Sequence, residues 1–317
     1  MADAASVAVT GASGFIGRRL IERLIRKGAS VRALARKKPV LADVDGGNLT
    51  IVQGRLGDDA SIDALIDGVD AVIHLAGLIK ARTSTAFFDV NADGVRHLAE
   101  RIAASPKPPK LVLVSSLAAR EPSLSSYAAS KRAGESALSG LSDASPWTIL
   151  RPPAVYGPGD RETLAFFKST RRGIGVMLGG DDARFSLIHV DDLIEAIDAV
   201  LAPDVADRLT LELDDGEEGG HGWRSMIAAA ERAFGRQVIP LTVPRTLLAA
   251  LGHINAGLRI LPGYTPMLTP EKVRELTHLD WVADNSHIQA ATGWKPAVSV
   301  DRGFPATIDW YQLHSWL

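Results

Sequence analysis

Short apolar runs alternate with amphipathic segments along the first half of the chain. Each apolar run has the length of a buried strand. In the segments between the runs, apolar residues recur at three- and four-residue spacing, which predicts helices with one buried face. This alternation is typical of an α/β fold with a doubly wound parallel sheet, the Rossmann architecture. The predicted strands are residues 6–9, 30–34, 48–52, 70–77 and 110–114, and the predicted helices are residues 14–27, 62–66, 86–104 and 128–138.

The second half of the chain departs from this alternation. A Gly- and Pro-rich stretch at residues 156–159 leads away from the sheet, and residues 186–190 return as a predicted sheet strand. We therefore predict two parts, a Rossmann domain and a smaller C-terminal substrate-binding lobe. The Rossmann domain takes residues 1–156 plus 186–202, and the lobe takes residues 157–185 plus 203–317.

Two apolar features of the predicted lobe have more than one interpretation. The apolar helix predicted over residues 246–261 fits the core of the lobe, a cover over a lipophilic substrate, or a surface for a partner. The side chains of Phe166, Phe167, Met177 and Leu178 fit either a substrate site or the core of the lobe.

Composition narrows the classes of function. The chain has 317 residues, a net charge of −2 and no cysteine. The absence of cysteine excludes disulfide, thiolate and Cys–zinc chemistry, and the balanced charge gives no reason to expect a nucleic-acid partner. The acidic loop at residues 214–222 lacks the ligand spacing of a metal site, so no metal is predicted. No apolar run is long enough to span a bilayer, and the first strand begins too early for a signal peptide, so we expect a cytoplasmic protein.

A glycine-rich turn joins the first predicted strand to the first predicted helix. Gly11, Gly14 and Gly17 are spaced three residues apart within the stretch Thr10–Gly17. At this position a turn can hold a pyrophosphate on backbone N–H groups and on the positive end of the helix dipole. The alternative interpretation is an ordinary tight turn between a strand and a helix.

The end of the second predicted strand indicates which dinucleotide is preferred. In Rossmann domains an acidic residue at this point binds the 2′-hydroxyl of NAD, whereas an arginine accommodates the 2′-phosphate of NADP. Here Ala35 is followed by Arg36, Lys37 and Lys38. This basic cluster favours NADP, with NAD as the second choice and a solvated basic loop as the alternative.

Three polar residues follow the fifth predicted strand. Ser116 lies at the end of that strand, and Tyr127 and Lys131 are four residues apart in a predicted helix. This spacing places the phenol and the ammonium on one helix face, where the ammonium favours the phenolate. Such a phenol can exchange a proton with an alcohol or a carbonyl oxygen, and the Ser116 hydroxyl can hold the same oxygen. Ser116, Tyr127 and Lys131 are therefore the predicted catalytic residues.

These segments together resemble an extended short-chain dehydrogenase/reductase of the NAD-dependent epimerase/dehydratase family. The resemblance extends over essentially the whole chain and includes the closing T-G-W-K-P at residues 292–296. The other matching motifs are T-G-A-S-G-F-I-G at 10–17, H-L-A-G at 74–77, N-A-D-G at 91–94, V-S-S at 114–116, Y-A-A-S-K at 127–131, L-R-P-P-A-V-Y-G-P-G at 150–159 and I-H-V-D-D-L at 188–193.

The resemblance implies roles for individual residues. Tyr127 is the acid/base, Lys131 holds the nicotinamide ribose, Ser116 bonds the reacting oxygen, and Asn91 supports the backbone of the active site. It also implies a small-molecule substrate and a homodimer. From the residues and the resemblance together, the predicted cofactor contacts are Gly11, Ser13, Gly14, Phe15, Ile16, Gly17, Arg36, Leu75, Ala76, Gly77, Asn91, Tyr127, Lys131, Pro153 and Val155.

Two departures from the family pattern concern the substrate. Nucleotide-sugar enzymes of the family place Asn three residues after the Arg that corresponds to Arg151, and an Arg at the position of Phe185, whereas this chain has Ala154 and Phe185. We therefore predict an NAD(P)-dependent oxidoreductase acting on a secondary alcohol or ketone. One alternative is a nucleotide-sugar epimerase or dehydratase with bound NAD, which would need another diphosphate anchor such as Arg184 or Arg171. The other alternative is a non-catalytic dinucleotide-binding accessory subunit.

Overall fold

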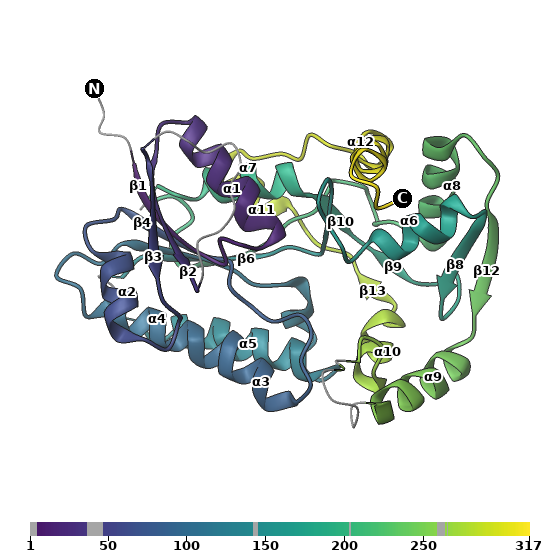
Figure 1. The fold of residues 1–317 in the computed structure, drawn as a ribbon, viewed down its shortest axis with the longest axis horizontal. Helices are drawn as coiled ribbons and strands as arrows, with labels where there is room; N and C mark the ends of the chain where they lie inside the picture. Colours follow the sequence, from purple (N-terminus) through teal and green to yellow (C-terminus); the bar gives the residue numbers. More distant parts are fainter. Residues whose placement is uncertain (1–4, 37–46, 142–144, 203, 259–263, 265) are drawn as a thin grey trace.

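The computed structural model describes residues 5–36, 47–141, 145–202, 204–258, 264 and 266–317. A central parallel sheet of seven strands confirms the predicted fold class (Figure 1). Its strand order is β11-β6-β5-β4-β1-β2-β3, which places β1 in the interior of the sheet. The strands are β1 (Ser6–Thr10), β2 (Ser30–Ala35), β3 (Leu49–Gln53), β4 (Ala71–His74), β5 (Lys110–Val114), β6 (Trp147–Arg151) and β11 (Leu209–Glu212).

Helices cover both faces of this sheet (Figure 1). Because side chains alternate across a strand, Val7 and Val9 of β1 join the hydrophobic cluster on one face, whereas Ala8 joins the cluster on the other. The first cluster includes residues of α1 (Phe15–Arg26), α7 (Val190–Ala199) and α11 (Ser286–Thr292), and the second includes residues of α2 (Asp59–Ile66), α4 (Gly94–Ala103) and α5 (Ser126–Leu138).

The helix predicted over residues 86–104 is interrupted at its start. Its first part is α3 (Ser84–Phe88), followed by a π-helical turn at Asp89–Asp93 and then α4. Gly134 of α5 packs against this turn so closely that a Cβ atom there would lie 2.2 Å from the carbonyl oxygen of Asn91. Widened turns of this kind are frequent at functional sites, and this one contains Asn91.

Segments that follow β7 (Ala154–Tyr156) pack around an aromatic core of their own, in the part of the chain predicted to form the second lobe. In this core the ring centroid of Phe167 lies 4.9 Å from that of Phe304 and 5.6 Å from that of Tyr311. Within the described residues no helix is long and apolar enough to cross a membrane. The remaining elements are α6 (Leu164–Arg171), β8 (Ile174–Leu178), β9 (Arg184–Phe185), β10 (Leu187–His189), α8 (Trp223–Phe234), β12 (Ile239–Val243), α9 (Arg245–Gly257), α10 (Pro270–Leu276), β13 (Asp280–Trp281) and α12 (Val300–Leu313).

Two strands differ in position from the sequence-based expectation. The segment at 186–190 forms β10, which pairs with β7 in a two-stranded sheet rather than with the central sheet. In the part of the chain assigned to the lobe, β11 pairs with β6 at the edge of the central sheet. Leu211 and Leu213 are fully buried there, so the gain from hydrophobic burial explains why a late segment completes the Rossmann sheet.

Candidate active site

The glycine-rich turn forms an open cradle between β1 and α1. Gly11 has a positive φ of 74°, and a Cβ atom on it would lie 2.7 Å from the backbone nitrogen of Ala76. A Cβ atom on Gly17 would lie 2.3 Å from the carbonyl oxygen of Gly11. Gly14 is the N-cap of α1 and has no side chain to cap the helix, while Ser13 and Gly14 are exposed. Uncapped N–H groups at an accessible helix N-terminus fit a diphosphate.

The carboxyl ends of β1 and β4 are joined next to this cradle. Thr10 Oγ1 lies 2.9 Å from His74 Nδ1 and accepts a hydrogen bond from the backbone N–H of Ala76 at 3.3 Å. Burial and the Lys131 charge lower the pKa of His74 to about 3, so its imidazole is neutral. His74 therefore has a structural role, holding the ends of β1 and β4 together. It is followed at the end of β4 by the half-buried Leu75 and Ala76 and the exposed Gly77.

The basic cluster after β2 is only partly described. Arg36 follows the last residue of β2 and is exposed, and among the described residues none forms a hydrogen bond or an ion pair with its guanidinium. Lys37 and Lys38 lie outside the described residues.

Asn91 ties the loop after β4 to α5. Its Oδ1 accepts a hydrogen bond from the backbone N–H of Leu78 at 2.7 Å. Its Nδ2 donates to the carbonyl oxygen of Leu78 at 2.9 Å and to Ser130 Oγ at 3.0 Å. The Asn91 amide therefore fixes the backbone after Gly77 against α5.

The three predicted catalytic residues come together where β5 and α5 meet. The Ser125 side chain caps α5 by accepting from the N–H of Ala128 at 3.0 Å, which sets the start of the helix that carries Tyr127 and Lys131. Lys131 Nζ donates to the carbonyl oxygen of Val114, the last residue of β5, at 3.0 Å. The Tyr127 phenol lies close enough to Ser116 for an interaction between them to act on the pKa of the phenol. One turn of α5 thus holds both side chains against the end of β5.

The protonation states of this group follow from its burial. Burial raises the pKa of Tyr127 to about 12, with a further contribution from the Glu275 charge, while the interaction with Ser116 acts in the opposite direction. Burial lowers the pKa of Lys131 to about 8, and the Glu135 charge opposes this shift. At neutral pH the Tyr127 phenol is therefore protonated and Lys131 is still predominantly cationic.

A large cavity opens in front of Ser116 and Tyr127. Its volume is about 680 Å³, within the range of small-molecule sites. Pro153 and Val155 do not line it, although Ala154 between them does. Sequence reasoning missed most of the lining, which comes from segments far apart in the chain. The apolar lining residues include Ile79, Ala154, Phe166, Phe167, Val176, Leu178, Phe185, Leu187, Trp223, Met226, Met267, Leu276, Trp281 and Phe304.

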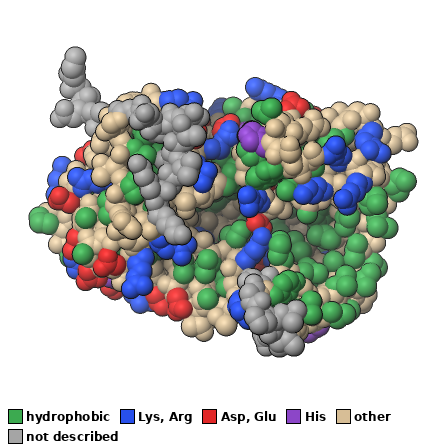
Figure 2. Space-filling view, in the orientation of Figure 1, with side chains coloured by type: hydrophobic (Ala, Val, Ile, Leu, Met, Phe, Trp, Pro, Cys, Tyr) green, Lys and Arg blue, Asp and Glu red, His purple; other side chains and the backbone are tan. Residues whose placement is uncertain are grey.

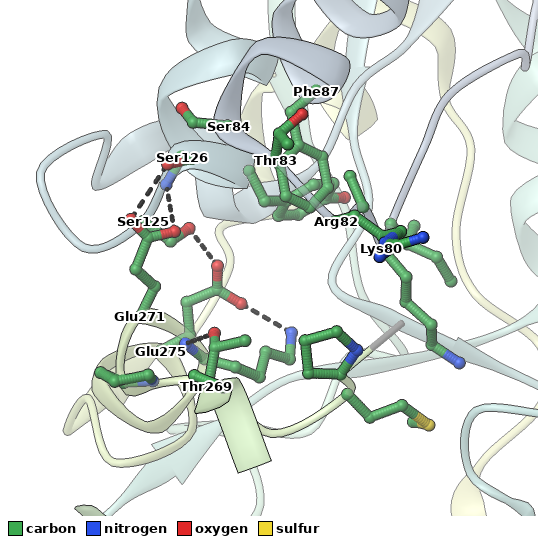
Figure 3. A pocket seen from close by; sticks show the side chains of 18 of the residues that line it. Lys80, Arg82, Thr83, Ser84, Phe87, Ser125, Ser126, Thr269, Glu271 and Glu275 are labelled. Carbon is green, nitrogen blue, oxygen red and sulfur yellow. Dashed lines mark hydrogen bonds and ion pairs between the residues drawn. The ribbon is translucent and has the colours of Figure 1, made fainter. Parts of the chain in front are cut away.

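A second, more polar cavity adjoins the first (Figure 3). Its volume is about 630 Å³, and Ile79, Tyr127, Met267, Lys272 and Glu275 line both cavities. Glu271 and Glu275 of α10 face the start of α5 across this space (Figure 3). Glu271 accepts hydrogen bonds from the N–H and the hydroxyl of Ser126, both at 3.0 Å, and Glu275 accepts from the Ser125 hydroxyl. The lobe thus contacts directly the helix turn that carries Tyr127.

Among the described residues, the two positions that usually anchor a diphosphate supply no polar side chain to the larger cavity. The residues that correspond to the usual anchors, Ala154 and Phe185, present apolar side chains to it. Arg184 and Arg171, the alternative anchors for a diphosphate, line neither of the two described cavities. Arg184 donates instead to the carbonyl oxygens of Asp181 and Ala183.

Both lysines that line the larger cavity among the described residues have carboxylate partners, as does the nearby Arg151. Lys80 pairs with Glu162 at 2.8 Å, and Lys272 pairs with Glu275 at 2.6 Å. Arg151 binds Glu135 through Nε and Nη2 at 2.9 and 2.6 Å. The cavity in front of Tyr127 is therefore suited to an apolar substrate.

Comparison with known proteins places the chain in a family. Residues 7–209 match the model of the NAD-dependent epimerase/dehydratase family. The chain belongs to this family. Membership confirms the resemblance seen in the sequence and the prediction of an NAD(P)-dependent enzyme of the short-chain dehydrogenase/reductase type.

Relatives of this epimerase/dehydratase family member include both reductases and epimerases. It is 37% identical to a ceramide reductase of Caulobacter vibrioides, over 98% of this chain and 96% of the relative. It is 27% identical to UDP-glucuronate 4-epimerase 5 of Arabidopsis thaliana, over 96% of this chain and 75% of that relative. Its fold matches a solved UDP-glucuronic acid 4-epimerase from Bacillus cereus in complex with UDP-glucuronic acid and NAD, with a TM-score of 0.75, 19% identity, and coverage of 98% of this chain and 99% of that one.

Proposed function

We propose that the protein is an NAD(P)H-dependent reductase of a ketone carried by a long-chain lipid of the ceramide type. The observation that carries this proposal is the apolar cavity in front of Ser116 and Tyr127. Its volume and apolar lining suit hydrocarbon chains, whose burial supplies binding energy in proportion to the area removed from water. The 37% identity with a ceramide reductase over nearly the full length supports the same substrate class.

Tyr127, Ser116 and Lys131 divide the proton chemistry between them. The Ser116 hydroxyl orients the carbonyl oxygen of the substrate, and the Tyr127 phenol donates a proton to that oxygen as it becomes an alkoxide. The raised pKa of Tyr127, about 12, keeps this donor protonated. The Lys131 ammonium stabilises the phenolate that remains. When bound, the nicotinamide cofactor supplies the hydride.

The glycine turn and Arg36 define how the cofactor is held. The backbone N–H groups of Phe15 and Ile16 start α1 without a side-chain cap, so we assign them to the diphosphate, whereas the Gly14 N–H donates to the carbonyl oxygen of Gly11 at 3.0 Å. Gly77 lies close enough to Lys131 that a Cβ atom on it would be 3.8 Å from Nζ, which suits binding of the nicotinamide ribose beside Tyr127. The exposed guanidinium of Arg36 suits a 2′-phosphate, so we propose that NADPH is preferred over NADH.

The cofactor preference is tested by titration. We expect Arg36→Ala to weaken NADPH binding about tenfold, the effect of losing one charge-assisted contact worth about 1.4 kcal/mol, and to leave NADH binding unchanged. Isothermal titration of both dinucleotides measures this directly. Equal losses for the two dinucleotides, or tighter NADH binding by the unsubstituted protein, would contradict the preference.

The reaction is tested by following cofactor oxidation with a ceramide-type ketone, in which the secondary alcohol of the long-chain base is replaced by a carbonyl. We expect turnover by the unsubstituted protein and a loss of at least about a hundredfold in Tyr127→Phe, the usual contribution of a general acid. Dinucleotide binding should survive this substitution, which shows that the variant is folded. Unchanged turnover by Tyr127→Phe would reject the assignment of Tyr127.

A further inference from the structure

An apolar surface lies next to the mouth of the cavities. Helix α9 exposes Leu247, Leu251 and Ile254, which share one helix face and are 49%, 43% and 65% exposed. On its other face Leu248 and Gly252 are buried, and Gly252 packs against α10. Amphipathic surface helices normally turn their apolar stripe toward the core, so α9 carries a second apolar stripe that the described chain leaves uncovered.

The neighbouring strand extends this surface. Ile239 and Leu241 of β12 are 74% and 53% exposed, and β12 directly precedes α9 in the chain. Figure 2 shows hydrophobic side chains gathered over β12 and α9, at the right and lower right of the view. Contiguous exposed apolar patches mark interaction surfaces. We call the set Ile239, Leu241, Leu247, Leu251 and Ile254 the apolar face.

The charge around the apolar face is one-sided. Between Glu231 and Glu271 the sequence contains no Asp or Glu, although these residues make up 37 of the 317 in the chain. Arg236 and Arg245 lie in the same stretch and are exposed. An apolar segment that carries exposed arginines and no carboxylate of its own complements a bilayer that contains anionic phospholipids.

The apolar face is also continuous with the substrate path. The second, more polar cavity is lined in part by α9, through His253, Ala256 and Gly257. Met267, which is 58% exposed, lines both cavities. A lipid that leaves a bilayer beside α9 therefore reaches Tyr127 along a lined route. This route for a lipid rests on the proposed function, whereas the exposed side chains of the apolar face and its arginines are independent of it.

We propose that the apolar face docks the enzyme onto the surface of an anionic phospholipid bilayer. Helix α9 lies in the interface with its stripe among the acyl chains, and Arg236 and Arg245 contact the headgroups. The occupant is a lipid surface rather than a second copy of the chain, because arginines on both copies would repel each other without a carboxylate to pair with.

The test is sedimentation with vesicles of phosphatidylcholine, with and without phosphatidylglycerol. We expect the full-length protein to bind the anionic vesicles and to be released by salt, which screens the arginine contribution. The double substitution Leu251→Glu/Ile254→Glu should weaken binding at least about tenfold, because burial of one such side chain is already worth that factor. The matched control is Leu313→Glu, since Leu313 is 81% exposed on α12 and does not belong to the apolar face.

Vesicle binding and catalysis are read separately. Because neither Leu251 nor Ile254 lines a described cavity, the double variant should keep dinucleotide binding and its melting temperature, which shows that it is folded. If the protein binds vesicles but turns over no lipid ketone, the docking surface stands and the proposed function fails. Equal vesicle binding by the double variant and the unsubstituted protein would overturn the docking proposal. The docking proposal would also be overturned if the protein bound no vesicles and formed a dimer that the double substitution dissociates.

Discussion

Replacement of Lys131 by methionine should stabilise the protein while it removes activity. Lys131 is 8% exposed, and burial lowers its pKa from 10.5 to about 8. A shift of this size corresponds to about 3 kcal/mol of unfolding free energy lost at neutral pH, at about 1.4 kcal/mol per pKa unit. The hydrogen bond from Nζ to Val114, worth about 1 kcal/mol, offsets part of this cost. Because methionine fills similar space without charge, Lys131→Met should gain about 2 kcal/mol at pH near 7.

The sign of the pH dependence makes this prediction specific. The unfolded chain keeps the ordinary pKa of Lys131, so between about pH 8 and 10.5 the unfolded state binds more protons than the folded state. The stability of the unsubstituted protein therefore rises through this range, and above it Lys131→Met should be less stable by about 1 kcal/mol, the worth of the lost hydrogen bond to Val114. Denaturant unfolding without cofactor, at several pH values, measures the difference between the two proteins, which cancels the contribution of other lysines such as Lys110. A variant less stable at neutral pH, or a difference that does not change with pH, would refute the reasoning.

Two further substitutions test the cofactor cradle and the contact between the lobe and α5. Gly17→Ala should weaken dinucleotide binding at least about tenfold in isothermal titration, because its Cβ would lie 2.3 Å from the Gly11 carbonyl oxygen. The control Gly140→Ala should bind normally, because a Cβ there has nothing within 4 Å. Equal affinities of the two variants would show that the turn does not hold the cofactor. Glu275→Gln should lower the pKa of Tyr127, because the Glu275 charge raises it, and so move the pH profile of alcohol oxidation to lower pH. A profile that stays in place while kcat falls would give Glu275 only a structural role.

The features predictable from sequence are those that depend on local pattern. The strands of the central sheet have short apolar runs, and Tyr127 and Lys131 lie on one helix because their four-residue spacing is fixed by helix geometry. The π-helical turn at Asn91 depends on close packing by Gly134, a contact over long sequence distance that no local window contains. The position of β11 depends likewise on where the sheet has an open edge.

The substrate side was less accessible to sequence reasoning. The cavity draws Ala154, Phe185, Trp223 and Trp281 from separate segments, and their convergence is a property of the tertiary structure. Single residues did give a signal, since Ala154 and Phe185 stand where polar anchors are usual in nucleotide-sugar enzymes. For α9 the pattern indicated an apolar helix, but periodicity alone does not show which of its apolar faces is covered.

The central claim is that the cavity in front of Tyr127 binds hydrocarbon, and its most direct test is the dependence of kcat/KM on chain length. Ceramide-type ketones of increasing acyl length are compared by following cofactor oxidation, and UDP-glucuronic acid is tested by chromatography of its product, because epimerisation consumes no net cofactor. Because each buried CH₂ contributes about 0.8 kcal/mol, kcat/KM should rise about threefold to fourfold per added CH₂ until the cavity is filled, with no turnover of the nucleotide sugar. A kcat/KM that is independent of chain length, or turnover of UDP-glucuronic acid alone, would contradict the account.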